Sequence, residues 1–168
     1  MEKCIMIIVT GATGELGRRI VERLLTRVPA HQVGASVREP EKAKALADRG
    51  VRVRRGSFTD PDSLAHAFED ASQVLIVSVD KMGDEVLNQH TVAIDAAVTA
   101  GARRILYTSQ MGASGSSRFQ ACRDHAATEE VLAACGVPVH LAAQRFLCHE
   151  RDAFPRPRAG DRQRGAPR

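Results

Sequence analysis

The sequence has few aromatic residues and no long apolar run. Among its 168 residues there are five Phe, one Tyr and no Trp. A membrane-spanning helix needs about 20 consecutive apolar residues, and no stretch here approaches that length, so no membrane span is expected. The four cysteines are scattered, without a Cys-x-x-Cys pair. This spacing argues against a disulfide framework and a zinc site, and no metal site is predicted.

A secretory leader is also not visible at the start of the sequence. Glu2 and Lys3 are followed at once by a β-forming apolar run. Together with the unpaired cysteines, which suit a reducing compartment, this start leads us to expect a cytoplasmic protein. Its length and composition, with 43% hydrophobic and 26% charged residues, are those of one globular domain.

The positive charge of the chain is confined to its end. Residues 151–168 contain six Arg and two Asp, which account for the whole net charge of +4. Residues 1–150 are therefore neutral in sum, and the basic balance is poor evidence for a fold that binds nucleic acid. Nucleic acid is not expected as a partner.

A glycine-spaced turn near the start carries the clearest functional signal. Residues 5–17 read IMIIVTGATGELG, and a helix-like apolar pattern follows. Gly11 can make a tight turn off the strand, Gly14 allows backbone to approach a pyrophosphate, and Gly17 allows close packing of helix on strand. The helix N-terminus would then face the phosphates. By itself the spacing also fits an ordinary glycine-rich turn.

Strand and helix patterns alternate through the rest of the chain. After the first strand, further strands are expected at 32–37, 51–54, 74–77 and 104–109, with a sixth beginning at 137–139. Helices are expected between them, including 40–49 with Ala43, Leu46 and Ala47 facing inward. Either Thr59 or Asp60 should cap the next helix. This alternation predicts an α/β fold, a doubly wound parallel sheet of Rossmann type with five to six strands.

The end of the second strand bears on the choice of dinucleotide. An acidic residue there binds the ribose hydroxyls of NAD, and a basic one accommodates the 2′-phosphate of NADP. Arg38 comes first after the strand, and a guanidinium can bind phosphate with two hydrogen bonds. NADP(H) is therefore preferred. Glu39 keeps NAD(H) open as the alternative, and Lys42 is interpreted as an exposed helix residue.

Four motifs together narrow the family. They read TGATGxLG from Thr10, VRxPxK from Val37, YTS from Tyr107 and HxxTE from His125. With this combination the chain resembles the atypical short-chain dehydrogenases, in particular the NmrA-like and NAD(P)H:quinone oxidoreductase branch, over roughly residues 4–139. The resemblance implies NADP(H) on a Rossmann sheet and hydride transfer to a small, quinone-like acceptor.

The resemblance also indicates which positions contact the cofactor. Relatives typically carry Asp after the glycine that follows the third strand, near the adenine. Here Gly56 is followed by Ser57, which can form a hydrogen bond but offers no carboxylate. The expected cofactor-binding residues are Gly11, Thr13, Gly14, Glu15, Leu16, Gly17, Arg38, Ser57, Val77 and Ser78.

The usual proton donor of short-chain dehydrogenases is not visible in the sequence. Those enzymes use a Tyr-x-x-x-Lys pair on the helix after the fifth strand. The single tyrosine, Tyr107, lies inside the predicted strand, and the spacing at the helix start gives Phe119 and Arg123. Alcohol dehydrogenase chemistry therefore lacks its acid. Quinone reduction is less demanding, because protons can come from water.

Two residues are candidates for assisting such a reaction. Ser109 could hydrogen-bond an acceptor carbonyl, and the alternative is a polar residue closing the strand. His125 could supply a proton, and the alternative is a packing or surface histidine. The same absence of a Tyr/Lys pair also suits a non-catalytic NmrA-like regulator that senses NADP(H) and binds a protein partner.

The last part of the sequence does not continue the pattern. We expect a dinucleotide-binding domain over 1–139 and an irregular, Arg/Pro-rich tail over 140–168. Relatives continue with a strand and a smaller domain that covers the substrate. Residues 140–151 can be back-translated so that a shifted frame restores the expected strand. A frameshift that leaves the substrate-covering part missing is therefore our hypothesis.

Overall fold

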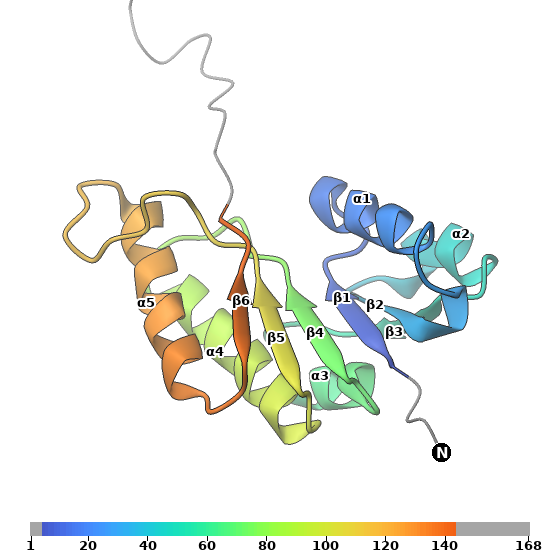
Figure 1. The fold of residues 1–168 in the computed structure, drawn as a ribbon. Helices are drawn as coiled ribbons and strands as arrows, with labels where there is room; N and C mark the ends of the chain where they lie inside the picture. The colour runs from blue at the N-terminus through green and yellow to red at the C-terminus, as the bar shows by residue number, and fades with distance from the viewer. Residues whose placement is uncertain (1–4, 144–168) are drawn as a thin grey trace, which may run out of the picture.

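The computed structural model describes residues 5–143, and within them one parallel sheet carries the fold (Figure 1). Its strand order is β3-β2-β1-β4-β5-β6, and every pairing is parallel. The expected doubly wound Rossmann sheet is confirmed, with the order reversing between β1 and β4. The strands are β1 Ile7–Thr10, β2 Val33–Val37, β3 Arg52–Arg55, β4 Gln73–Ile76, β5 Arg104–Tyr107 and β6 Val139–Leu141.

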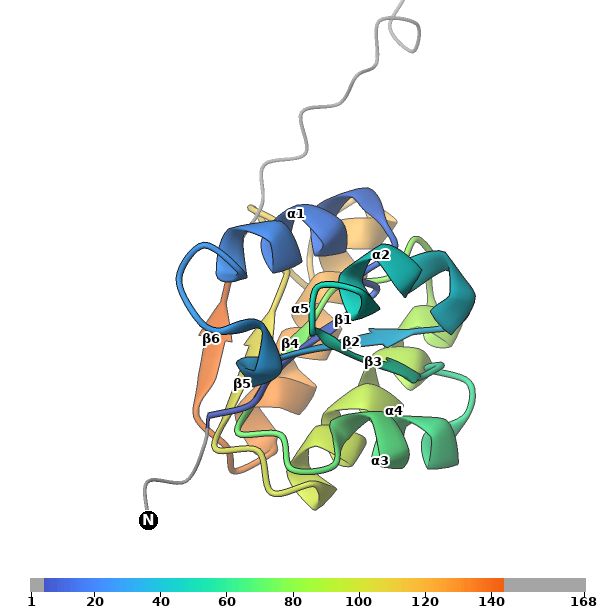
Figure 2. The same ribbon diagram turned by 90° about the vertical axis from the view of Figure 1, so that its right-hand side faces the viewer.

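Helices cover both faces of the sheet, as Figure 2 shows with the sheet seen nearly edge-on. Helices α1 and α2 lie on one face, and α3, α4 and α5 lie on the other. Two short 3₁₀ turns, η1 and η2, lead into β2 and α2. The bounds are α1 Glu15–Leu24, η1 Ala30–Gln32, η2 Pro40–Ala43, α2 Lys44–Ala47, α3 Pro61–Phe68, α4 Asp84–Thr99 and α5 Gln120–Ala134.

The sheet separates two apolar cores. Successive side chains of a strand point to opposite faces, so Ile8 belongs to the core under α3, α4 and α5 while Val9 belongs to the core under α1 and α2. Phe68 and Leu64 are fully buried in the first of these cores. Burial on both faces holds β1 and β4 rigidly in the centre, where their carboxyl ends meet the glycine turn.

The segment expected as one helix over 40–49 is divided in the structure. A 3₁₀ turn, η2, precedes the four-residue α2, because Ala43 has φ −105° and ψ 14°, outside helical geometry. Ala43 and Leu46 are buried, whereas Ala47 is exposed, so its expected inward position is wrong. The change of winding between the two turns moves Ala47 to the solvent side.

Helix α3 begins at the expected cap. The carboxylate of Asp60 accepts a hydrogen bond from the N–H of Ser63 at 3.1 Å, and Pro61 follows in the first turn. Arg55 forms an ion pair with the same Asp60, with 2.6 Å between nitrogen and oxygen. These contacts hold the short turn between β3 and α3 on the side of the sheet where the strands end.

The last strand runs beyond the expected domain boundary at 139. Val139 pairs with Ile105 and Leu141 pairs with Tyr107, because backbone pairing at a sheet edge does not need an alternating side-chain pattern. Leu141 remains 47% exposed. The greater part of the expected tail, 144–168, lies outside the described residues. No helix in residues 5–143 is long and apolar enough to cross a membrane.

Candidate cofactor site and adjoining cavity

The glycine turn after β1 has the backbone geometry that its spacing predicted. Gly11 has φ +60°, a conformation that side-chain-bearing residues rarely adopt. Its N–H donates to the carbonyl of Ser36 at 3.0 Å, which ties the turn to β2. The N–H of Gly14 donates to the Gly11 carbonyl at 2.9 Å. The chain thus reverses tightly and enters α1 directly above the end of the strand.

Gly17 is required by close packing. A Cβ at this position would lie 2.3 Å from the Gly11 carbonyl oxygen and 2.7 Å from the Gly11 carbonyl carbon. Both are backbone atoms of the turn, so neither can rotate away. At Gly14 the corresponding distance to the Gly11 oxygen is 3.3 Å. The first turn of α1 therefore rests directly on the glycine turn.

The start of α1 offers donors for an anion. Helix α1 has Gly14 as its N-cap, and no side chain caps it. Within residues 5–143 no hydrogen bond is formed by the N–H of Thr13, Glu15 or Leu16. Uncapped N–H groups at a helix N-terminus bind phosphate well. The Glu15 carboxylate is paired with Arg19 at 2.7 Å, which offsets its repulsion of a phosphate.

The charged groups after β2 differ in whether they form ion pairs. Arg38 is exposed at the end of the strand and forms no ion pair with any described residue. Glu39, the alternative ribose partner, is instead paired with Lys42 at 2.7 Å. A guanidinium without a partner beside a neutralised carboxylate suits a phosphate better than a bare ribose hydroxyl. The pairing also gives Lys42 a local role on the surface.

Ser57, the position that departs from relatives, begins the turn between β3 and α3. Its hydroxyl lies 2.9 Å from the hydroxyl of Thr59, and its N–H donates to the hydroxyl of Ser63 at 2.9 Å. Gly56 before it is buried, and a Cβ there would lie 2.1 Å from the Ser36 hydroxyl. Ser57 therefore lies beside the end of β2, on the same edge as Arg38.

Two threonines join the strand ends around Val77 and Ser78. The N–H of Val77 donates to the Thr10 hydroxyl at 2.9 Å, and the N–H of Ser78 donates to the Thr108 hydroxyl at 2.8 Å. These bonds hold the segment after β4 between the ends of β1 and β5. Sequence reasoning did not assign Thr10 and Thr108 this role, although a polar residue at the end of each buried strand was the available signal.

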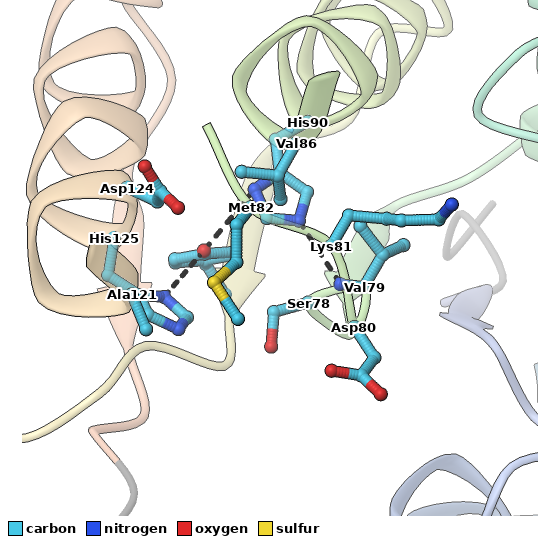
Figure 3. Close-up of a pocket in the computed structure, with 11 residues that line it drawn as sticks. Ser78, Val79, Asp80, Lys81, Met82, Val86, His90, Ala121, Asp124 and His125 are labelled. Atoms are coloured by element: carbon cyan, nitrogen blue, oxygen red, sulfur yellow. Dashed lines mark hydrogen bonds between the residues drawn. The ribbon is translucent and has the colours of Figure 1, made fainter. Parts of the chain in front are cut away.

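A cavity of about 370 Å³ opens beside this segment. It lies between the β4–α4 connection and the first turns of α5, with the side chains converging as Figure 3 shows. Its floor is aromatic and its rim carries Asp80, Lys81 and the exposed Met82. The lining residues are Ser78, Val79, Asp80, Lys81, Met82, Val86, His90, Tyr107, Ala121, Asp124 and His125.

Three aromatic residues from three elements form a hydrogen-bonded group at the floor. The Tyr107 hydroxyl lies 2.7 Å from Nδ1 of His125 and 3.4 Å from Nδ1 of His90. The rings of His90 and Tyr107 pack edge to face, with centroids 5.3 Å apart. Tyr107 thus lies inside β5 as the sequence predicted, and its hydroxyl, which has no exposed surface, is directed at these two imidazoles.

Burial keeps these three side chains uncharged near neutral pH. Burial lowers the pKa of His90 to about 4, assisted by repulsion from His125 and opposed by Asp124. Burial also lowers the pKa of His125, against the attraction of Glu129 and Asp124. The pKa of Tyr107 is raised, chiefly because its anion would be buried. The group therefore acts through neutral hydrogen bonds.

His90 and Asp124 hold the connection between β4 and α4 in place. The N–H of Val79 donates to Nε2 of His90 at 3.2 Å, and the N–H of Gly83 donates to the Asp124 carboxylate at 2.9 Å. Gln120 donates to the other carboxylate oxygen at 2.5 Å. Sequence reasoning missed both residues. A buried histidine in α4 gives no local signal, because its partners are distant in sequence.

The two expected assisting residues occupy different environments. His125 is 9% exposed and lines the cavity. Ser109 is 2% exposed, donates a short hydrogen bond to the carboxylate of Glu129, and is absent from the cavity lining. The remaining expected site residues, in the glycine turn and at the strand ends, lie along the same edge of the sheet (Figure 1).

Phe119 and Arg123, which stand at the spacing of the Tyr-x-x-x-Lys pair near the start of α5, are not the residues that face the cavity. Phe119 is 71% exposed, and Arg123 donates to the carbonyl of Ser117 at 2.7 Å. The residues that face the cavity with the same spacing are Ala121 and His125. A histidine therefore occupies the second of these positions, and the first has no polar side chain. Among residues 5–143 no group of three acidic, His or Cys side chains could hold a metal.

Acidification is expected to destabilise the protein through His90. Its pKa is 6.5 in the unfolded chain and about 4 in the folded one, so the unfolded chain binds more protons between these values. The stability that comes from keeping His90 neutral is therefore fully present above pH 6.5 and is lost as the pH falls toward 4. Between about pH 7 and about pH 4.5 the free energy of unfolding should fall by about 2 kcal/mol.

Urea unfolding at several pH values checks this expectation. His90→Gln keeps a hydrogen-bonding side chain without a titration in this range, so its stability should depend less on pH than that of the original chain. His66→Gln, at an exposed position of α3, is the matched control and should leave the slope unchanged. If the free energy of unfolding depended on pH in the same way in all three proteins, that result would contradict a buried, neutral His90.

Comparison with known proteins agrees with the glycine turn and the fold. A family model described as NAD(P)H-binding matches residues 11–146. Quinone oxidoreductase 2 of Escherichia coli (strain K12) is 39% identical over 132 residues, which are 79% of this chain and 46% of that protein. An NmrA-like family domain-containing oxidoreductase of Aspergillus flavus is 31% identical over 135 residues, covering 77% and 44%.

Solved structures show the same similarity. The triphenylmethane reductase of Citrobacter sp. in complex with NADP(H) has a TM-score of 0.78 and 38% identity, covering 82% of this chain and 49% of that one. The NADPH complex of the quinone oxidoreductase from Escherichia coli has a TM-score of 0.77 and 38% identity, covering 83% and 48%. The chain thus spans about half the length of the relatives it matches.

Proposed function

Because the chain belongs to the NAD(P)H-binding family, we propose that it binds NADPH at the glycine turn and transfers hydride to a quinone-like acceptor in the adjoining cavity. The observation that carries this proposal is the juxtaposition of the two sites. The uncapped start of α1 and the cavity lie on one edge of the sheet, and Val77 and Ser78 connect them.

The residues present fit a dinucleotide. Gly14 would let the backbone approach a pyrophosphate, Gly17 lets α1 pack on the turn, and the N–H groups of Thr13, Glu15 and Leu16 would bind the phosphates. Arg38 would hold the 2′-phosphate, and Ser57 would lie toward the adenine side. NADP(H) is therefore the preferred cofactor, with NAD(H) the alternative. When bound, NADPH supplies the hydride.

The cavity suits an acceptor that needs little acid catalysis. Its floor of His90, Tyr107 and His125 is uncharged near neutral pH. A quinone that accepts hydride becomes a resonance-stabilised anion, which water can protonate later. Met82 and Val86 add apolar surface for a flat ring. A small aromatic carbonyl compound is therefore the proposed partner of the site.

His125 and Ser109 take unequal parts in this proposal. His125 lines the cavity, where it would hydrogen-bond an acceptor oxygen. The hydroxyl of Ser109 donates a hydrogen bond to the carboxylate of Glu129. Ser109 would therefore assist only by holding this carboxylate near His125. Removing the side chain of His125 should therefore impair turnover more than removing the hydroxyl of Ser109.

NADPH oxidation with 1,4-naphthoquinone, followed at the nicotinamide absorbance band, tests the activity. We expect His125→Ala to lower kcat/KM about tenfold, the effect of losing one useful hydrogen bond. Ser109→Ala should change kcat/KM by less than about threefold, which corresponds to about 0.7 kcal/mol. His66→Ala is the exposed control. An unaffected His125→Ala variant would remove this residue from the proposal.

Cofactor binding is measured separately through NADPH fluorescence. Binding with turnover supports the proposed oxidoreductase. Binding without oxidation by any of a panel of quinones would favour the alternative, a cofactor-sensing regulatory protein with a protein partner. If the protein bound neither NADPH nor NADH, the result would overturn both the oxidoreductase and the regulatory-protein proposals.

A further inference from the structure

We propose that Tyr107 is a positioning residue that holds His125 with its proton on Nε2, so that this N–H points into the cavity as a hydrogen-bond donor to the acceptor carbonyl. The role as donor to an acceptor rests on the proposed function. The position of the proton rests only on the hydrogen bonds around the cavity floor, which begin at a backbone amide of the β4–α4 connection (Figure 3).

The first bond determines the state of His90. A backbone N–H can only donate, and the N–H of Val79 points at Nε2 of His90, 3.2 Å away. Nε2 must therefore accept, and a neutral imidazole that accepts at one nitrogen carries its hydrogen on the other. His90 is thus protonated on Nδ1. Its burial, with 1% of the residue exposed, keeps it neutral.

The second bond shows where that hydrogen goes. Nδ1 of His90 lies 3.0 Å from the hydroxyl of Thr128, whose own hydrogen is donated to the carbonyl of Asp124 at 2.9 Å. The Thr128 oxygen therefore accepts from His90. Thr128 is fully buried, so this arrangement also satisfies a hydroxyl that would otherwise have no water to bind.

The third bond determines the state of His125. Tyr107 cannot donate to Nδ1 of His90, because that nitrogen already carries a hydrogen. Of the two imidazole nitrogens beside the phenol, Nδ1 of His125 is the closer, at 2.7 Å, compared with 3.4 Å for the His90 nitrogen. Tyr107 has no exposed surface and must place its hydrogen within the protein. His125 therefore accepts at Nδ1 and carries its hydrogen on Nε2.

The consequence lies at the cavity. Nε2 of His125 forms no hydrogen bond with a described residue, and His125 is part of the cavity lining. An N–H in this position would donate to the oxygen of a bound carbonyl. Hydride transfer to the acceptor raises negative charge on that oxygen, and a hydrogen bond from a fixed donor then becomes more favourable. The hydrogen stays on His125, and water later protonates the reduced product.

Nuclear magnetic resonance of the full chain labelled with ¹⁵N-histidine tests the proton positions directly. Two-bond ¹H–¹⁵N spectra distinguish the two neutral forms of each imidazole. Near pH 7.5 we expect His90 with its proton on Nδ1 and His125 with its proton on Nε2. The exposed His31 and His66 serve as internal references. His125 protonated on Nδ1 would overturn the proposal.

Tyr107→Phe removes the phenol hydrogen bond and keeps the ring. In this variant we expect His125 to become a mixture of both neutral forms, while His90 remains protonated on Nδ1. A purely structural role for Tyr107 would leave the distribution at His125 unchanged, and that result would also overturn the proposal. Thermal unfolding of the same sample establishes that the variant is folded. The spectra of the original chain remain decisive if it is not.

A ligand experiment separates this inference from the proposed activity. With NADP⁺ present no hydride is available, and adding 1,4-naphthoquinone should shift the His125 Nε2–H resonance but not that of His66. In turnover assays Tyr107→Phe should lower kcat about twofold, less than His125→Ala does, with little change in KM, because part of the His125 population keeps its proton on Nε2. Absence of turnover together with the expected proton positions and shift would overturn only the activity. Turnover without the shift would overturn the inference.

Discussion

Replacing Gly17 by alanine is expected to lower the free energy of unfolding by about 3 kcal/mol and to abolish measurable NADPH binding. The new methyl group would lie 2.3 Å from the Gly11 oxygen, well inside van der Waals contact. Because the obstructing atoms belong to the backbone, helix α1 must move away from the turn. Overpacking of this kind costs about 1–3 kcal/mol in well-packed proteins, and a rigid backbone neighbour places the cost at the upper end.

The effect on binding follows from the same displacement. The N–H groups at the start of α1 bind phosphate only if they converge on one point, and moving the helix spreads them apart. Urea unfolding measures the stability, and NADPH fluorescence measures the binding. Gly115→Ala is the matched control, because a Cβ there meets nothing within 4 Å and its φ is not positive. A Gly17→Ala variant as stable as this control would contradict the packing described for the turn.

Gly14→Ala separates the two effects of the glycine turn. Its Cβ would lie 3.3 Å from the Gly11 oxygen, a contact that a small adjustment relieves. Stability should therefore change little, whereas the methyl group would project where a pyrophosphate approaches. If Gly14→Ala lost stability and kept NADPH affinity, the cofactor would not bind across this turn.

Replacing Arg38 by glutamine is expected to weaken NADPH binding about 30-fold or more while leaving NADH binding nearly unchanged. A hydrogen bond to a charged group contributes about 1.5–3 kcal/mol, and Arg38 forms no ion pair in the described residues that would have to be broken first. The 2′-phosphate is absent from NADH. The ratio of the two dissociation constants therefore isolates the contribution of Arg38.

Lys42→Gln is the control for this experiment. Lys42 is paired with Glu39 on the protein surface, and removing its charge should alter NADPH binding by less than about threefold. The same variant frees Glu39 and should improve NADH binding slightly, since a carboxylate can then reach ribose hydroxyls. If Arg38→Gln weakened both cofactors equally, Arg38 would contact a group that they share, and the preference for NADP(H) would be wrong.

The two parts of the site depend on different kinds of contact. The cofactor turn is held by backbone bonds between neighbours on the sheet, such as that from Gly11 to Ser36. The cavity floor is held by side chains from β5, α4 and α5. Substitutions in the turn should therefore act on binding, and substitutions at the floor should act mainly on the chemical step.

Much of the fold was predictable from the sequence because its signals are local. The apolar run before Gly11 and the cap at Asp60 each depend on residues a few positions apart. Such patterns predicted the parallel sheet and the tight glycine turn after β1. They were less informative at α2, where a change of winding exposed Ala47, and at β6, where edge pairing extends to Leu141.

By itself, the sequence determined the dinucleotide turn, the alternation of strands and helices, and the basic residue after β2. Only the tertiary structure decided what surrounds the second site. Tyr107 meets His125 across 18 positions, and His90 meets Thr128 across 38. No periodicity connects such residues, because they become neighbours only when β5 is placed beside two helices of the same face. The sequence therefore predicted the turn at which we propose that the cofactor binds, and the packing of α4 and α5 on the sheet showed how the cavity beside it is built.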